Sequence, residues 1–309
     1  MKRILFVFLD GVGLGPPAAT NPLATATWSA FERMASGQSW TRPFASVDAD
    51  RHVVRPIDAT LGIEGLPQSG TGQATLFSGA NGAALVGRHF GPFPHSATHD
   101  VLDRNNLFHR VHALFTDRPQ PAAFANAYPP QFFDRMRQNG RWTVTTRCCH
   151  TAGVEVRGLA DVQHGRALTA ELTGAAWRNQ LDLDVPILTE AEAGTRLADI
   201  HRQHAFTLFE YFLTDKVGHG RLDLPPAHIL RGLDRFFGAI LEALDPERES
   251  LVVTSDHGNL EDTERRTHTR NPVPLVVQGW AAPYFRDVAS IADVTPSIVA
   301  ALRDAARNR

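Results

Sequence analysis

The sequence has very little cysteine, which excludes a fold that depends on disulfide bonds. Only Cys148 and Cys149 are present, and they are adjacent in the chain. Neighbouring cysteines can bridge only with strain, so this pair cannot form a disulfide framework. We therefore expect two small, semi-buried thiols and a reducing compartment, the cytoplasm.

An excess of positive charge is also missing. Lysine and arginine together number 31 and aspartate and glutamate 33, so the formal net charge is -2 at pH 7. A surface without a basic field has no general attraction for nucleic acid. We therefore expect no nucleic-acid partner, and the sequence leaves the oligomeric state open.

Long hydrophobic runs are absent as well. The apolar run at residues 4–9 is interrupted by Asp10, and it is too short for a signal peptide or a membrane-spanning helix. We expect a β-strand there and no membrane association.

What the sequence does contain is the pattern of an α/β protein. Its 309 residues are 43% hydrophobic, which is enough to bury a large core. Apolar runs at residues 4–9, 122–128, 207–213, 251–253 and 274–277 predict buried strands, with helical patterns between them. This alternation predicts an α/β fold with a mostly parallel central sheet.

The alternation of strands and helices is lost between residues 131 and 188. This arginine-rich segment is interpreted as a small cap inserted over the active site. The remainder, residues 1–130 and 189–309, is the predicted catalytic domain.

Residues that can bind metal follow the predicted strands. Asp10 ends the first apolar run beside Gly11, although an Asp-Gly pair is also common in ordinary turns. Asp215 and His219 are four residues apart, which places them on the same face of a helical turn. Because parallel strands end at the same edge of a sheet, we expect these side chains to meet.

The run at residues 251–253 leads to Asp256 and His257, and His268 follows shortly after. Adjacent residues of a regular strand point to opposite sides, so the turn at Gly258 must bring both Asp256 and His257 to the site. Carboxylate mixed with imidazole suits two divalent ions such as Mn²⁺ or Zn²⁺, whereas an all-oxygen set would indicate Mg²⁺ or Ca²⁺.

A glycine-rich turn provides two candidate nucleophiles, Ser69 and Thr71, at the start of a helical pattern that ends at Gly79. A helix N-terminus favours negative charge, and it would stabilise both an alkoxide and a phosphate. The alternative for either hydroxyl is an ordinary helix cap.

These motifs resemble those of the alkaline phosphatase superfamily, and most closely its cofactor-independent phosphoglycerate mutase and phosphopentomutase branch. The resemblance covers about residues 1–90 and 205–302. The motifs that carry it are Asp10-Gly11, Asp215-x-x-x-His219, Ser255-Asp256-His257-Gly258-Asn259 and His268-Thr269-x-Asn271-Pro272-Val273-Pro274.

The resemblance implies a three-layer α/β sandwich of the alkaline phosphatase type with two metal ions. One ion would be held by Asp215, His219 and His268, and the other by Asp10, Asp256, His257 and the nucleophile. Thr71 is preferred as that nucleophile and metal ligand, because Thr71-Gly72-Gln73 is similar to the Thr-Gly-His of phosphopentomutases. Here Gln73 replaces the histidine of that motif.

The short 131–188 segment also bears on the reaction. The phosphoglycerate mutases of this branch carry a large inserted transferase domain, and a mutase must exclude water until the phosphoryl group returns. A metal-dependent phosphohydrolase of a small phosphorylated metabolite, acting through a phosphothreonine, is therefore the leading hypothesis, for either monoesters or diesters. A mutase of sugar phosphates or phosphoglycerate is the second, and a non-catalytic phospho-ligand-binding member the third. The candidate substrate contacts are Arg88, His89, Arg147 and Lys216.

Overall fold

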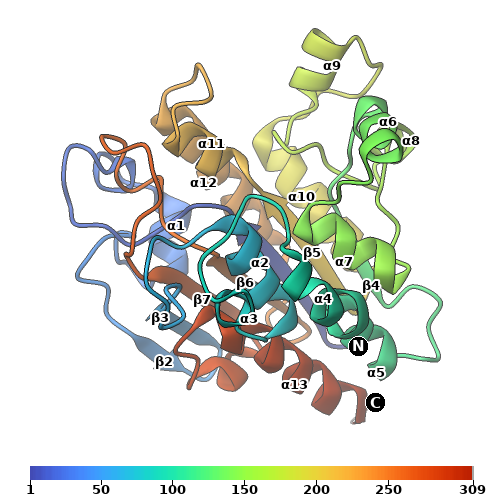
Figure 1. The fold of residues 1–309 in the computed structure, drawn as a ribbon, viewed down its shortest axis with the longest axis horizontal. Coiled ribbons are helices and arrows are strands. Elements are labelled where there is room, and N and C mark those ends of the chain that lie inside the picture. Colours follow the sequence, from blue (N-terminus) through green and yellow to red (C-terminus); the bar gives the residue numbers. More distant parts are fainter. Residues whose placement is uncertain (308–309) are drawn as a thin grey trace.

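The computed structural model describes residues 1–307 and contains one seven-stranded sheet covered by helices on both faces (Figure 1). The strand order is β2-β3-β7-β6-β1-β5-β4. The strands are β1 (Arg3–Leu9), β2 (Val47–Ala49), β3 (His52–Ile57), β4 (Ala122–Phe124), β5 (Phe206–Tyr211), β6 (Glu249–Ser255) and β7 (Val273–Gly279).

Strand β1 lies at the centre of the parallel part of the sheet. It pairs in parallel with β5 and β6, and β4 pairs in parallel with β5. Strand β7 is antiparallel to both β6 and β3, and β2 is antiparallel to β3. Only β2 and β7 therefore run against the common direction of the described strands, which confirms a mostly parallel α/β sheet.

The two faces of β1 belong to two hydrophobic cores, because successive side chains of a strand point to opposite sides. Ile4, Phe6 and Phe8 are buried in one core, and Leu5, Val7 and Leu9 in the other. Each fully buried side chain of this size contributes about 1.5–3 kcal/mol to folding. Helices pack over both cores, which gives the three-layer arrangement.

The helices divide between the two faces. The face with Phe6 is covered by α2 (Ser69–Ser78), α4 (His99–Asn105), α5 (Leu107–Leu114), α7 (Val144–Ala152) and α13 (Val294–Arg307). The opposite face is covered by α1 (Ser29–Met34), α10 (Glu190–His201) and α12 (Pro226–Ala243). Two short helices, α3 (Gly82–Val86) and α11 (Leu213–Gly218), follow α2 and β5. None of the helices within residues 1–307 has the length and apolar character needed to cross a bilayer.

The segment predicted as a cap contains α7 together with α6 (Pro130–Asn139), α8 (Leu159–Gln163) and α9 (Ala175–Leu181). Helix α7 buries Val144 and the two free cysteines, Cys148 and Cys149, in the main core. By contrast, Trp177 of α9 belongs to a small separate cluster. In Figure 1, α6, α8 and α9 lie at the upper right, apart from the sheet. The boundaries of a cap at residues 131–188 stay a prediction.

Candidate metal centre

The candidate metal ligands lie together at the edge of the sheet where β1, β5 and β6 end. Asp10 follows β1, Asp215 and His219 lie on and just after α11, and Asp256 and His257 follow β6. His268 reaches the same edge by a different route. It precedes β7, which runs antiparallel to its neighbour β6. Strand β7 therefore begins at the edge of the sheet where β6 ends.

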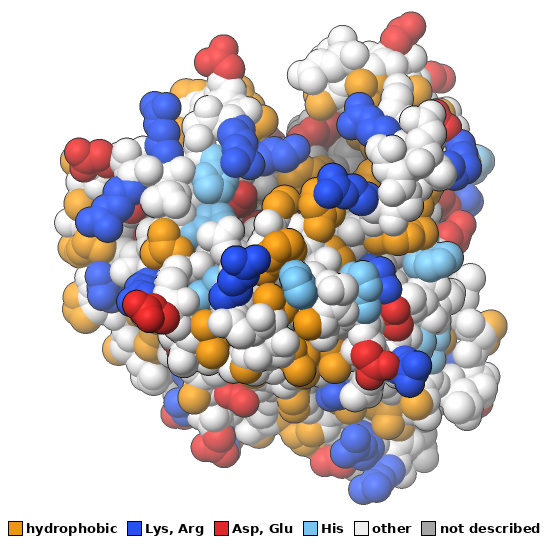
Figure 2. All heavy atoms as spheres, in the orientation of Figure 1, with side chains coloured by type: hydrophobic (Ala, Val, Ile, Leu, Met, Phe, Trp, Pro, Cys, Tyr) orange, Lys and Arg blue, Asp and Glu red, His pale blue; other side chains and the backbone are white. Residues whose placement is uncertain are grey.

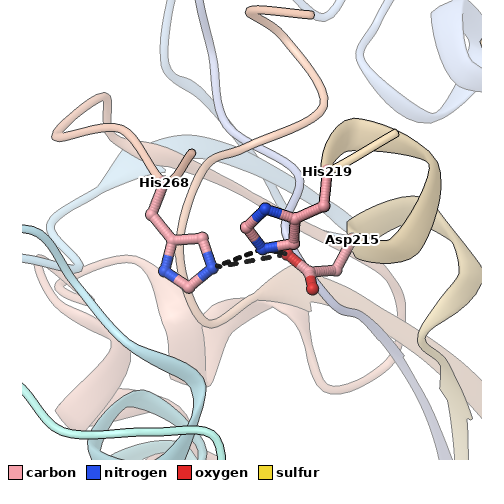
Figure 3. A group of neighbouring side chains, drawn as sticks. All are labelled: Asp215, His219 and His268. Atoms are coloured by element: carbon pink, nitrogen blue, oxygen red, sulfur yellow. Dashed lines mark hydrogen bonds and ion pairs between the residues drawn. The ribbon is translucent and has the colours of Figure 1, made fainter. Parts of the chain in front are cut away.

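The first ligand group consists of Asp215, His219 and His268 (Figure 3). The Nε2 atoms of the two histidines are 3.1 Å apart, and they lie 3.4 Å (His219) and 3.5 Å (His268) from Oδ1 of Asp215. In each ring the other nitrogen faces a backbone carbonyl: Nδ1 of His219 is 2.9 Å from the oxygen of Arg266, and Nδ1 of His268 is 2.6 Å from that of Pro67.

These carbonyl contacts decide which ring nitrogen can bind a cation. A carbonyl oxygen only accepts, so each Nδ1 carries the hydrogen and each Nε2 of a neutral ring presents its lone pair. Two lone pairs and a carboxylate oxygen then face one another. Burial alone would lower the pKa of His268, but its contacts with Asp215 and the Pro67 carbonyl outweigh burial and raise that pKa. The geometry therefore favours a cation at this point and fits a metal ion.

The second ligand group is buried more deeply and joins Asp10 and His257 with the shared Asp215. Nε2 of His257 lies 3.5 Å from Oδ1 of Asp10 and 3.4 Å from Oδ2 of Asp256. The side chains of Asp256 and His257 thus reach the same point, as the turn at Gly258 requires. Within residues 1–307, neither Oδ1 of Asp10 nor Oδ2 of Asp256 accepts a hydrogen bond.

Such unpartnered, buried carboxylate oxygens are costly unless a cation satisfies them. Burial and the charges of Asp256 and Asp215 raise the pKa of Asp10, while burial and Asp215 raise the pKa of Asp256 to about 7. Burial and the neighbouring His268 lower the pKa of His257 to about 3, so its imidazole is neutral and can act as a ligand. This donor set fits a divalent ion.

The two candidate nucleophiles have different surroundings. Ser69 is the first residue of α2, and its hydroxyl lies 2.9 Å from Nε2 of His257. The hydroxyl of Thr71 instead donates to the carbonyl of Gln68 at 3.2 Å and accepts from the amide of Phe90 at 3.1 Å. The structure therefore brings Ser69 into the metal centre and gives the Thr71 hydroxyl a backbone contact on each side.

Gln73, which replaces a histidine of the resembling motif, supports the centre from the next turn of α2. It is buried, and its side-chain nitrogen lies 3.3 Å from Oδ2 of Asp10, to which it donates. This contact helps to orient one oxygen of Asp10 and leaves the other free for a cation.

Glu261 is a residue of the centre that sequence reasoning missed. Its Oε2 accepts from the backbone amides of Gly13 at 3.0 Å and Asn259 at 2.8 Å, and its Oε1 accepts from the Thr269 hydroxyl and from the Asn271 side chain. One buried carboxylate thus joins the three loops that carry Asp10, His257 and His268. The one sequence signal that could have pointed to Glu261 is its position, two residues after the motif that ends at Asn259.

The four predicted substrate contacts all have partners outside the metal-ligand groups. Arg147 forms a bidentate ion pair with Asp103 at 2.6 Å, and Lys216 lies 4.6 Å from the centre of the Phe212 ring. The guanidinium of Arg88 lies 5.9 Å from the ring of Phe90, and His89 contacts the carbonyl of Ile63 at 3.3 Å. Their roles as substrate contacts stay predictions.

A further acidic residue, Glu210 of β5, is buried behind the centre. The Asn126 side chain donates to its carbonyl at 2.7 Å and accepts from its amide at 2.8 Å, which fixes the backbone. No donor within residues 1–307 reaches its Oε2. Burial raises the pKa of Glu210 from 4.5 to about 7.

This pKa shift predicts how stability changes with pH. Between pH 4.5 and about 7 the folded protein keeps the Glu210 proton, whereas the unfolded chain has released it, so the free energy of unfolding falls as pH rises. Relative to Glu210→Gln, the free energy of unfolding of the wild type should fall by roughly 2.5 kcal/mol between pH 5 and 8. Denaturant unfolding at several pH values measures this difference, with the exposed Glu242→Gln on α12 as the control. If the free energy of unfolding changed with pH in the same way for the wild type and for Glu210→Gln, the raised pKa of Glu210 would be contradicted.

Comparison with known proteins finds a family model that matches the C-terminal part of this chain. Residues 182–304 match the model of the Metalloenzyme superfamily, and this segment contains five of the predicted ligands: Asp215, His219, Asp256, His257 and His268. The 2,3-bisphosphoglycerate-independent phosphoglycerate mutase of Aliivibrio fischeri is 27% identical over 189 residues, which cover 58% of this chain and 36% of the relative. That of Thermomicrobium roseum is 32% identical over 130 residues, covering 38% and 24%. The matched part of the chain thus spans between about a quarter and about a third of the length of these curated relatives: 36% of the first and 24% of the second.

Solved structures share the fold at low sequence identity. A protein from Pyrococcus horikoshii matches with a TM-score of 0.56 and 15% identity, covering 97% of this chain and 96% of that one. A cold-active alkaline phosphatase from Shewanella sp. matches with a TM-score of 0.52 and 13% identity, covering 97% and 99%. Phosphoglycerate mutase from Leishmania mexicana matches with a TM-score of 0.50 and 11% identity, covering 97% and 95%. With the sheet described above, these results show that the chain has an alkaline-phosphatase-like fold and that residues 182–304 resemble the Metalloenzyme superfamily.

Proposed function

We propose that this protein is a metal-dependent phosphohydrolase that acts on a small phosphorylated metabolite, with Ser69 as nucleophile. The observation that carries the proposal is the Ser69 hydroxyl, 2.9 Å from His257 Nε2 at the N-terminus of α2. The sequence alone favoured Thr71, and the two backbone contacts of the Thr71 hydroxyl move the preference to Ser69.

Two divalent ions, bound by the ligand groups around Asp215, would supply positive charge to the phosphate oxygens and favour a deprotonated nucleophile. Ser69 gives its proton to solvent and attacks phosphorus. The Ser69 Oγ to phosphorus bond forms as the bond between phosphorus and the ester oxygen breaks, and the leaving oxygen takes up a proton from solvent. The positive end of α2 stabilises negative charge beside Ser69. Water then attacks the phosphoserine, which releases inorganic phosphate and restores the hydroxyl.

A phosphomutase is the second candidate, because the curated relatives are named as phosphoglycerate mutases. A mutase returns the phosphoryl group to a second position of the same substrate, whereas a hydrolase gives it to water. A substrate with radioactive phosphorus separates the two reactions: label in inorganic phosphate supports hydrolysis, and label on an isomeric product supports a mutase.

Metal removal should abolish the reaction. After chelation we expect phosphate release from small phosphomonoesters to fall by at least about 100-fold, because uncompensated buried carboxylates remain around Ser69. Added Mn²⁺ or Zn²⁺ should restore it, and Mg²⁺, a hard ion that prefers oxygen ligands, should restore it less well. The readouts are phosphate release and metal content by mass spectrometry. Full activity in a protein shown to contain no metal would refute the proposal.

A further inference from the structure

A cavity of about 490 Å³ is lined by a loop that packs against the first turn of α2, the turn that carries the candidate nucleophile. Its lining is formed by the loop at residues 90–94 and by the segment at residues 140–142, together with His99 and Arg147. The loop packs against the first turn of α2: the Thr71 amide donates to the carbonyl of Phe90 at 2.8 Å. A Cβ atom added to Gly91 would lie only 3.3 Å from the amide nitrogen of Ser69. One wall of the cavity is therefore the loop that packs against the backbone of the residue proposed to attack phosphorus.

The lining combines apolar surface with one unneutralised positive charge. Phe90, Phe93 and Trp142 supply aromatic surface, and the guanidinium of Arg141 lies 5.0 Å from the centre of the Phe93 ring. No carboxylate within residues 1–307 forms an ion pair with Arg141, whereas Asp103 neutralises Arg147. Arg141 is exposed and keeps its donors for a ligand.

Another cavity near the sheet edge has the opposite charge. It has about 240 Å³, lies between α9 and α12, and is lined by Glu171 and Glu190 with Tyr211. Acidic groups repel the negative groups of a phosphorylated metabolite, so this second cavity is the poorer place for one. Figure 2 shows a broad hollow in the surface between the lobe that carries α11 and the lobe that carries α9. Basic side chains lie on both sides of this hollow.

We propose that the cavity behind the 90–94 loop receives the leaving group of the phosphoester, and that Arg141 selects leaving groups that carry a second anionic group, a carboxylate or a phosphate. The ring of Phe93 and the indole of Trp142 contact the apolar part of that leaving group. This inference rests on the proposed phosphoryl-transfer function and names the substrate class of the same site. A guanidinium binds carboxylate and phosphate through paired hydrogen bonds, which methionine at this position cannot form.

The test compares phenyl phosphate with 4-carboxyphenyl phosphate and with the bisphosphate of 1,4-dihydroxybenzene on the metal-loaded enzyme. We expect kcat/KM of the wild type to favour at least one of the two doubly anionic esters by about tenfold, as a charge-assisted hydrogen bond predicts. Arg141→Met should bring that ratio close to one. The matched control is Arg135→Met, an exposed arginine of α6 outside the cavity, and it should keep the wild-type ratio. The carboxylate and phosphate arms show which anion is preferred.

A wild-type ratio near one for both anionic esters, or an unchanged ratio in Arg141→Met, would overturn the inference. Calorimetric binding of the same esters to metal-loaded Ser69→Ala separates this inference from the proposed function. One outcome is that the wild type hydrolyses no ester, while Ser69→Ala binds the doubly anionic esters more tightly than phenyl phosphate and loses this preference when Arg141→Met is added. That outcome would refute hydrolysis and support the subsite. Turnover without any dependence on Arg141 would support hydrolysis and refute the subsite.

Discussion

Replacing Ser69 by alanine is expected to lower phosphoester hydrolysis by at least about 10³-fold, because it removes the attacking oxygen while leaving the metal ligands in place. Thr71→Val should lower it far less. Valine keeps the shape of threonine but leaves the Phe90 amide without its acceptor, at a cost of about 1–3 kcal/mol in stability. The two variants therefore separate a chemical role from a structural one at positions two residues apart.

The measurement pairs steady-state hydrolysis with thermal melting and with mass spectrometry of acid-quenched enzyme. A phosphorylated peptide that contains Ser69 should accumulate in the wild type and be absent from Ser69→Ala. Metal content must be equal in the compared samples, because a variant that failed to bind metal would also be inactive. Full activity in Ser69→Ala together with inactivity of Thr71→Val would restore Thr71 as the nucleophile.

The second large effect is expected at Glu261, which touches neither candidate ion site but holds the loops around both. Glu261→Gln should weaken metal binding by about 10- to 100-fold, as changes to the groups that orient ligands commonly do. The carboxylate accepts from two backbone amides, a hydroxyl and a side-chain amide. Glutamine would direct its own NH₂ group at some of these donors, so the loops that carry Asp10, His257 and His268 would move apart.

Metal affinity measured by calorimetry is the main readout for this variant, since a purely structural role would change the melting temperature alone. The neighbouring Asp262→Asn is the matched control, because the Asp262 carboxylate forms only a surface ion pair with Arg265 at 3.2 Å. The role assigned to Glu261 would be wrong if Glu261→Gln bound Mn²⁺ and Zn²⁺ as tightly as the wild type. Glycine at positions 13 and 258 belongs to the same arrangement, because a Cβ on either residue would lie 2.2 Å from Oε1 of Glu261.

Much of the fold could be predicted because β1, β5 and β6 are buried on both faces. A strand of this kind is a continuous apolar run, and such runs stand out even in a single sequence. Except for His268, the candidate metal ligands follow these runs closely, so their convergence at one edge required only the rule that parallel strands end together. The family motifs then pointed to the same residues.

Other parts depend on tertiary pairing that the local sequence does not contain. Strands β2 and β3 lie in a polar stretch, and β3 carries Pro56 opposite Pro274 of β7, so neither strand has a clear apolar pattern. The choice between Ser69 and Thr71 depends on the first residue of α2. Each helical residue is rotated by about 100° from the previous one, so two residues apart point in nearly opposite directions. Glu261 was missed because its partners come from three separate loops.

The central position of β1 has a consequence for how the chain is made. Ile4 pairs with Phe206 and Ser250, so β1 leaves the ribosome roughly 200 residues before its first partner strand. At about 5–20 residues per second, this apolar segment waits roughly 10 to 40 s without a hydrogen-bonding neighbour. An unpaired strand rich in isoleucine, leucine, phenylalanine and valine is prone to join other chains. The strand best protected in the finished sheet is thus the one that the nascent chain most needs to shield.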